Sequence, residues 1–362
     1  WLVHVSIAMV FFPLLWTCLS VSGFMPVIED VFADPVAQRA ASIAILFGFL
    51  WGIGGIMFGV SVPYIGLSLT MGIVMGIAGT LGALIPLLQN ENATSLPQFP
   101  FVTVGLVITI IGVVITAKAG IDRDKLQGNS SLSGGNILKG IAIAVVCGIL
   151  SSLLAVGHTN VNDDVTLIAE NYGINGRNAS LIAWLIVFIG AYAMNVLYSL
   201  VLIVKNNSWS NFSVAGSKKA YMWSIIAGLC WFAALGLYGQ GAALMNGASE
   251  NNLGNIVGWP MLLGLSLIVS NIWAYRSGEW KGAKKPFNLL LVGLVVLIIA
   301  SVILGYSNSW SNDDSSSGKT YEDADRYNKS LGGTTQRTPG VKPSETPFQD
   351  TLKNIQKKPT GV

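Results

Sequence analysis

The chain contains a series of apolar stretches about 20 residues long, each bounded by charged or turn-forming residues. A helix of that length crosses the hydrocarbon core of a bilayer. Only 11% of the residues are charged, whereas a soluble domain carries about 25%. We therefore expect an all-α membrane protein, a polytopic helical bundle with about nine visible spans, at residues 2–24, 40–62, 64–88, 101–117, 138–156, 180–204, 220–245, 255–275 and 287–306.

Several function classes are excluded by what the sequence lacks. The net charge of +3 is too small to indicate nucleic acid as a partner. The three cysteines lie inside apolar stretches and indicate neither a disulfide framework nor a metal site. The sequence has no phosphate-cradling loop and no nucleophile with a base nearby. We therefore expect neither an enzyme nor a bound cofactor, and no ATP-driven transport by this chain alone.

Basic and acidic residues alternate between successive loops. Three loops are rich in Lys and Arg. Their basic residues are Arg123, Lys125, Lys139, Lys205, Lys218, Lys219, Arg276, Lys281, Lys284 and Lys285. The loops between them are acidic, with Glu29, Asp30, Asp34, Asp163, Asp164, Glu170 and Glu250. The positive-inside rule then predicts that the Lys-rich loops are cytoplasmic and that the C-terminal tail lies outside the cytoplasmic (inner) membrane.

Two pairs of spans have similar sequences in the same order. Trp51, Phe58 and Gly59 in the second span have the spacing of Trp231, Tyr238 and Gly239 in the seventh. The fourth span reads VGLVITIIGVVI and the ninth reads VGLVVLIIASVI. Chance similarity between apolar segments is the alternative explanation. A duplication predicts two halves of opposite orientation, an architecture common among transporters.

The pairing of the second span with the seventh leaves the fifth span without a counterpart. We therefore expect a five-plus-five inverted repeat whose first helix is missing from this sequence. The expected organisation is a first half at residues 1–117, a cytoplasmic linker at 118–137, a second half at 138–306 and a disordered polar tail at 307–362.

The segment LFGFLWGIGGIMFGVSVPYIGLSLTMGIVMGIAGTLGALIPLL, residues 46–88, resembles the L-rhamnose–proton symporter family of the drug/metabolite transporter superfamily. GVVITAKAG, ending at Gly120, and LKGIAIAVVCGILSS, ending at Ser152, are similar to it as well. The resemblance implies ten helices and proton-coupled sugar uptake. The sequence departs from the family after Ser152 and around Tyr238 and Gln240, which are regions expected to face the solute.

Proton coupling needs a group that titrates near the working pH. His158 is the best candidate, because an unperturbed imidazole has a pKa of about 6.5 and a nearby carboxylate raises it. Asp163 and Asp164 follow it closely and are the candidate carboxylates. We place all three just beyond the fifth span, where a solvated outer loop without a coupling role is the alternative.

A sugar site needs polar groups for hydroxyls and aromatic walls for C–H faces. The candidate walls are Trp51, Phe58, Trp231 and Tyr238, although Trp and Tyr also anchor helices at membrane interfaces. The candidate polar groups inside spans are Thr70, Asn195 and Gln240. Unpaired amides are costly in hydrocarbon, so Asn195 and Gln240 should face the protein interior, where joining helices is the alternative to binding solute.

These observations favour a secondary active transporter for uptake of a sugar, L-rhamnose or a related monosaccharide, together with a proton. One alternative is a carrier that exports or exchanges another metabolite. The other is a membrane receptor or scaffold that does not transport. The substrate, the coupling ion and the oligomeric state stay open at this point.

Overall fold

The computed structural model describes residues 1–89, 93–128, 137–248 and 253–307. Two compact units, residues 1–311 and 312–362, divide the chain, and the described helices all belong to the first. Every described element is helical, which confirms the all-α class. In chain order the elements are α1 (Leu2–Ser6), η1 (Ile7–Phe11), α2 (Phe12–Ser20), α3 (Phe24–Ala33), α4 (Pro35–Ile65), α5 (Leu67–Gln89), η2 (Ala93–Ser95), α6 (Phe99–Leu126), α7 (Ile137–Glu170), α8 (Gly176–Lys205), η3 (Trp209–Ser213), α9 (Ser217–Ala248), α10 (Gly254–Arg276) and α11 (Lys284–Ser307).

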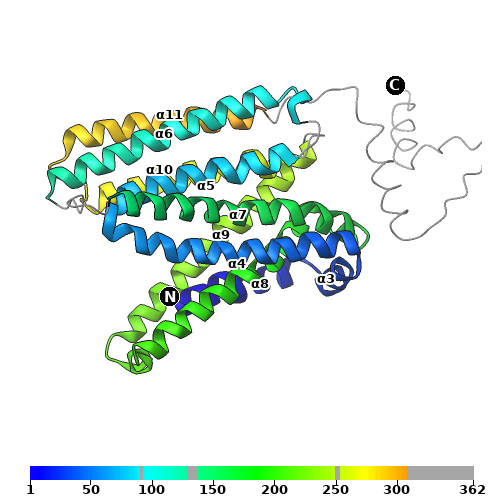
Figure 1. Ribbon diagram of the computed structural model, residues 1–362. Coiled ribbons are helices and arrows are strands. Elements are labelled where there is room, and N and C mark those ends of the chain that lie inside the picture. The colour runs from blue at the N-terminus through cyan, green and yellow to red at the C-terminus, as the bar shows by residue number, and fades with distance from the viewer. Residues whose placement is uncertain (90–92, 129–136, 249–252, 308–362) are drawn as a thin grey trace, which may run out of the picture. The chain divides into compact units, whose positions relative to one another are not determined.

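Eight stretches of the described residues are long and apolar enough to cross a membrane. One of them, Pro35–Gln89, has 55 residues, more than twice the length that one crossing needs. This stretch contains α4 and α5, which run in opposite directions on either side of α7 (Figure 1). The reversal occurs at Gly66, whose φ of 79° is readily adopted only by glycine. The expected boundary between the second and third spans therefore falls close to this turn.

The first span ends earlier than expected and is followed by a helix that the sequence analysis missed. Helix ends at Ser20 instead of residue 24, and the separate helix α3 begins at Phe24. Val27 and Val31 are buried on one side of α3, whereas Glu29 and Asp30 are exposed on the other. This short amphipathic helix has too few residues to cross a bilayer, so the pattern of long apolar stretches could not reveal it.

The α4 and α8 backbones approach closely at glycines. A side chain at Gly48 would clash with the carbonyl oxygen of Val187, and one at Gly190 would clash with the carbonyl oxygen of Ile45. Small residues allow such approach in helical membrane proteins, where packing must replace the hydrophobic effect. Contacts of this kind fix α8 against α4, and α7 packs along another side of α4.

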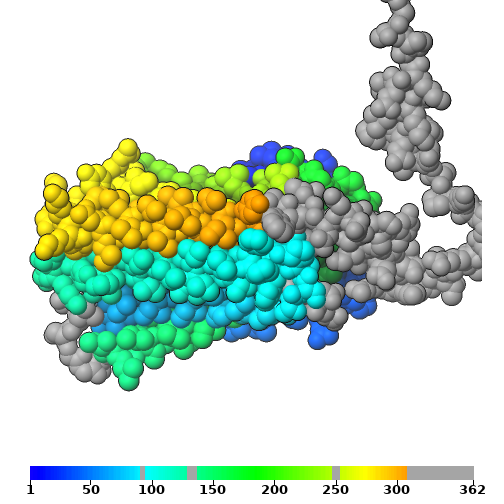
Figure 2. Space-filling view, turned by 90° about the horizontal axis from the view of Figure 1, so that it is seen from above, coloured from blue at the N-terminus to red at the C-terminus, as the bar shows by residue number. Residues whose placement is uncertain are grey.

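The helices α6 and α11 form a long antiparallel pair at one side of the described bundle. Figure 2 shows α11, in yellow and orange, lying along α6, in teal and cyan, and Figure 1 shows their opposite directions. These are the fourth and ninth predicted spans. The predicted tail, beyond Ser307, lies outside the described residues, as does part of the predicted linker, at residues 129–136. The start of that linker is helical, because α6 continues to Leu126.

Candidate functional site

The two tryptophans that the repeat pattern paired lie against each other. Trp51 comes from α4 and Trp231 from α9, and their ring centroids are 5.8 Å apart. Both rings are half-buried. Because these helices are 180 residues apart in numbering, this contact ties the two predicted halves together at an aromatic pair.

A cavity of about 700 Å³ opens between α1, α4, α8, η3 and α9. Its walls carry the hydroxyls of Tyr198, Ser199 and Tyr221 as well as apolar side chains. On α4 the wall includes Gly55 and Gly59, and a Cβ atom at either would meet no atom within 4 Å. Glycine therefore serves two purposes on α4. Gly48 allows close packing, whereas Gly55, two turns later, lines open space.

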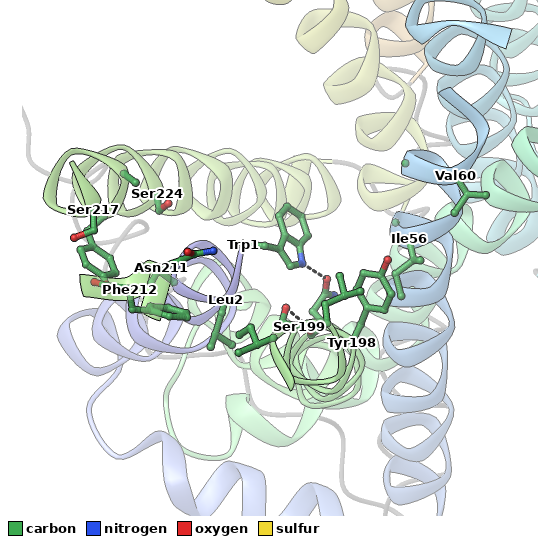
Figure 3. Close-up of a pocket in the computed structure, with 18 residues that line it drawn as sticks. Trp1, Leu2, Ile56, Val60, Tyr198, Ser199, Asn211, Phe212, Ser217 and Ser224 are labelled. Carbon is green, nitrogen blue, oxygen red and sulfur yellow. Dashed lines mark hydrogen bonds between the residues drawn. The ribbon is translucent and has the colours of Figure 1, made fainter. Parts of the chain in front are cut away.

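Asn195 lies at this cavity and is 3% exposed. Its side-chain oxygen accepts a hydrogen bond of 3.0 Å from the indole N–H of Trp1, drawn as a dashed line in Figure 3. Its amide N–H group donates to the carbonyl of Ala191 at 2.9 Å. The expectation that Asn195 faces the protein interior is therefore met, and the polar side chain borders a space large enough for a small solute.

His158 lies inside a helix and is fully buried, which corrects its expected place in a loop. The fifth span was expected to end at residue 156, but α7 continues to Glu170. Val161, Val165 and Ile168 are buried along this extension. The helix continues because these apolar residues recur at helical spacing. The polar residues between them lower the average hydropathy of the segment, so hydropathy alone does not show the helix.

The imidazole of His158 stacks on the indole of Trp184 from α8, with ring centroids 4.0 Å apart. Its Nε2 atom lies 3.4 Å from the hydroxyl oxygen of Ser180, also on α8. Its Nδ1 atom has no hydrogen-bond partner among the described residues. Ser180 thus contacts Nε2, and Nδ1 is left available for a hydrogen bond to another group.

A continuous series of aromatic rings joins His158 to the tryptophan pair. Trp184 stacks on Phe188, with 5.3 Å between ring centroids, and Phe188 lies 5.8 Å from Trp231. Trp231 then meets Trp51. The rings of Phe188, Trp231 and Trp51, which we call the aromatic layer, therefore connect the region of His158 with α4, the helix that also lines the cavity.

Tyr238 is buried and borders the same region from α9. Its ring centroid lies 6.1 Å from that of His158, and its hydroxyl donates to the backbone carbonyl of Asn255 at 2.9 Å. On its other side it meets the ring of Trp259, whose indole N–H donates to the carbonyl of Ala78. Gln240, two residues further along α9, is half-buried and stays a candidate without a placed role.

The two carboxylates expected beside His158 lie near the end of the same helix. Asp163 is exposed and Asp164 is half-buried. Asp163 is five residues beyond His158, so the helical repeat of about 3.6 residues turns its side chain away from the imidazole. The two carboxylates remain candidates for carrying a proton along α7 to His158, but they do not contact it directly.

Phe58 and Thr70 lie apart from the aromatic layer. Phe58 packs in a cluster that includes Ile65 and Cys147, near the turn between α4 and α5. Thr70 is buried and accepts a hydrogen bond of 3.0 Å from the hydroxyl of Ser61. The structure therefore brings Trp51, Trp231, Tyr238 and His158 into one series of rings but leaves these two residues outside it.

A charged cluster near the turn between α4 and α5 was missed by the sequence analysis. Arg123, at the end of α6, pairs with Asp124 at 2.8 Å and with Glu279 at 3.1 Å. Its guanidinium carbon lies 4.9 Å from the ring centroid of Trp280. A second cavity of about 240 Å³ borders this cluster between α5, α6 and α10. The contacts tie α6 to the segment between α10 and α11.

The described helices are long enough to cross a membrane and enclose a solute-sized cavity, with buried polar groups beyond an aromatic layer. This combination is typical of helical membrane carriers. The family model described as L-rhamnose-proton symport protein (RhaT) matches residues 9–309. The chain belongs to this family, which confirms the resemblance seen in residues 46–88. It is a family of transporters and not of enzymes.

Similar proteins carry the same description. The L-rhamnose-proton symporters of Yersinia pestis (strain Pestoides F) and Yersinia pseudotuberculosis serotype O:1b (strain IP 31758) are each 29% identical to this chain over 269 residues. The match covers 72% of this chain and 76% of each relative. No solved structure is significantly similar to the chain.

Proposed function

We propose that this protein is a secondary active transporter that carries a sugar, L-rhamnose or a related monosaccharide, into the cytoplasm together with a proton. The observation that carries the proposal is the cavity of about 700 Å³ between the two predicted halves, in a chain whose family is described by L-rhamnose and proton symport. Pockets for small ligands usually have volumes of about 300–1,000 Å³.

Contacts between α6 and α11 support an inverted repeat. The aligned motifs are offset by 188 residues, since Val104 corresponds to Val292. A Cβ atom at Gly105 would lie 2.7 Å from the side chain of Leu304. One at the equivalent Gly293 would lie 2.6 Å from Thr116, which is the equivalent of Leu304. Reciprocal contacts of this kind are typical of a two-fold axis between equivalent elements.

The distribution of basic residues supports an orientation for the cavity. Among the described residues, most of the basic side chains belong to the helix ends at the left of Figure 1. They are Arg123, Lys125, Lys139, Lys205, Lys218, Lys219, Arg276, Lys284 and Lys285. The cavity reaches the end of α8 and the start of α9, which belong to this side. By the positive-inside rule it opens to the cytoplasm, in the cytoplasmic membrane.

A cavity that opens on one side of an aromatic layer fits one state of an alternating-access cycle. The region around His158, Ser180 and Trp184 is fully buried on the other side of this layer. Movement of the α4 half against the α9 half would separate Trp51 from Trp231 and open that region. In this cycle His158 takes up the coupled proton, because it is a titratable side chain buried beside the solute path.

The test is uptake of radiolabelled L-rhamnose into vesicles that hold the full-length protein, with and without an imposed inward proton gradient. We expect a gradient to raise the rate and to drive accumulation, and a protonophore to abolish both. Vesicles without the protein are the control. L-rhamnose uptake at the same rate with and without the gradient would contradict proton coupling. Transport in the outward direction alone would favour the exporter alternative.

A further inference from the structure

Buried polar atoms gather where α7, α8, α9 and α10 meet, and they lack hydrogen-bond partners among the residues that the structure describes. They are His158 Nδ1, Thr159 Oγ1, Asn162 Oδ1, Trp184 Nε1 and Asn255 Oδ1. A buried polar group without a partner costs about 1–3 kcal/mol, and proteins keep few of them. Their concentration in one region of a carrier therefore indicates a function.

Ring contacts, a hydrogen bond to the backbone and helical spacing link the residues that carry these atoms. Asn162 follows His158 by four residues and Thr159 by three, so on α7 its side chain neighbours both of them. His158 stacks on Trp184, and Tyr238 links this pair to α10 through the carbonyl of Asn255. We call the group the His158 cluster, and it consists of His158, Thr159, Asn162, Ser180, Trp184, Tyr238 and Asn255.

The chemistry of the His158 cluster selects a class of ligand. The Trp184 indole can only donate a hydrogen bond, the Asn162 oxygen can only accept one, and the Thr159 hydroxyl can do either. No Asp, Glu, Lys or Arg belongs to the cluster, and its one group that gains a charge near neutral pH, His158, is assigned to the coupled proton, so the cluster offers no permanent charge to a phosphate or a carboxylate. A neutral solute with several hydroxyl groups supplies both donors and acceptors, and its C–H faces fit aromatic rings.

We propose that the His158 cluster is the site that holds the hydroxyl groups of a neutral monosaccharide during transport. The Trp184 indole donates to a solute oxygen, and the Asn162 and Asn255 oxygens accept from solute hydroxyls. This inference rests on the proposed function, because it specifies where the transported sugar binds. It adds Trp184, Asn162 and Asn255 to the residues that determine specificity.

The site is closed in this conformation, since His158, Ser180 and Trp184 are fully buried. The aromatic layer of Phe188, Trp231 and Trp51 joins the cluster to the part of α4 that lines the cavity. Solute therefore reaches the site when this layer moves. The hydrogen bonds that the cluster gains from the solute offset the cost of its unpartnered atoms, and this gain favours the solute-bound state.

The first variant is Trp184→Phe, which removes the indole N–H and keeps an aromatic ring against His158. The matched control is Trp280→Phe, since the Trp280 indole is also buried and also lacks a hydrogen-bond partner among the described residues. Trp280 lies at the charged cluster with Arg123, outside the proposed site. The purified full-length proteins are heated with and without L-rhamnose and with a panel of other neutral monosaccharides.

We expect a sugar to raise the melting temperature of the parent protein and of Trp280→Phe, and the apparent Kd of Trp184→Phe to be about tenfold higher. Both unliganded variants should melt somewhat earlier than the parent and by a similar amount, because each shortens a buried side chain without removing a protein hydrogen bond. An unchanged sugar affinity in Trp184→Phe would overturn the proposal, because it would mean that the indole N–H does not donate to the solute. Absence of stabilisation by every monosaccharide would overturn it as well.

This measurement separates the binding site from the proposed transport activity. Binding needs no proton gradient, so Trp184-dependent stabilisation together with gradient-independent uptake would keep the site and reject proton coupling. Gradient-driven uptake with equal affinity in Trp184→Phe and the parent would keep the proposed function and reject the site.

Discussion

His158 lies in a helix where a loop was expected, and the difference has a physical cause at the residue scale. The run HTNVNDD is polar enough to suggest solvent. Yet His158, Asn162 and Val165 are buried on α7, since the polar residues on that side face other helices. A polar side chain facing a buried site and one facing water look alike in a single sequence.

The role of His158 can be tested by His158→Gln, which keeps hydrogen-bonding capacity but does not titrate. Accumulation driven by a proton gradient should fall by at least tenfold, while exchange of labelled for unlabelled sugar continues. The assay compares uptake under a gradient with equilibrium exchange in the same vesicles. Glu170→Gln, at an exposed position at the end of the same helix, is the comparison variant. Unchanged gradient-driven accumulation in His158→Gln would exclude His158 as the coupling residue.

The aromatic residues were only partly predictable. The pairing of Trp51 with Trp231 followed from their positions in the two similar spans, and the rings do meet. Trp184 and Phe188 were missed because an aromatic residue in an apolar span has the same sequence signature whether it faces lipid or protein. Their only local signal is the neighbouring Ser180, a small polar residue at the span boundary, which by itself is weak.

At the scale of elements, the apolar stretches predicted the helices well and their ends poorly. Every predicted span has a helix, but α7 continues 14 residues past the expected end at residue 156. The helix α6 likewise continues to Leu126, past the expected end at residue 117. Hydropathy reports where a helix meets lipid, whereas the helical backbone continues as long as local packing supports it.

Glycines on α4 give a test of helix packing. Gly48→Ala should lower the melting temperature, because the added methyl group clashes with the carbonyl oxygen of Val187, and overpacking costs about 1–3 kcal/mol. Gly55→Ala adds the same group on the same helix, where it meets no atom within 4 Å. It should leave the melting temperature equal or slightly higher, since alanine favours helix. Thermal unfolding in detergent measures both, and equal losses would contradict the described α4–α8 contact.

At the scale of the whole molecule, the described residues form a bundle whose long helices alternate in direction (Figure 1). The sequence predicted this arrangement through the alternation of basic and acidic loops and through the similar spans. It could not predict where the predicted halves leave a cavity. That property depends on how closely α4, α8 and α9 approach, which side-chain packing in three dimensions decides.

The proposed orientation can be tested by thiol labelling. In a background in which Cys18, Cys147 and Cys230 are replaced, Ser217→Cys at the cavity mouth should react with a membrane-impermeant maleimide only from the cytoplasmic side. Glu29→Cys on α3 should react only from the outside. The measurement compares intact cells with inside-out vesicles. The reverse pattern would mean that the cavity opens outward.

The bare stretch of α4 at Gly55 and Gly59 suggests where solute size can be tuned. The wall there is backbone, so a methyl or hydroxymethyl group projects into open space instead of into a neighbouring helix. Such a change narrows the cavity by a small step at little cost to the fold. Substitutions at these two positions are therefore the simplest way to redesign a carrier of this type so that it excludes larger solutes.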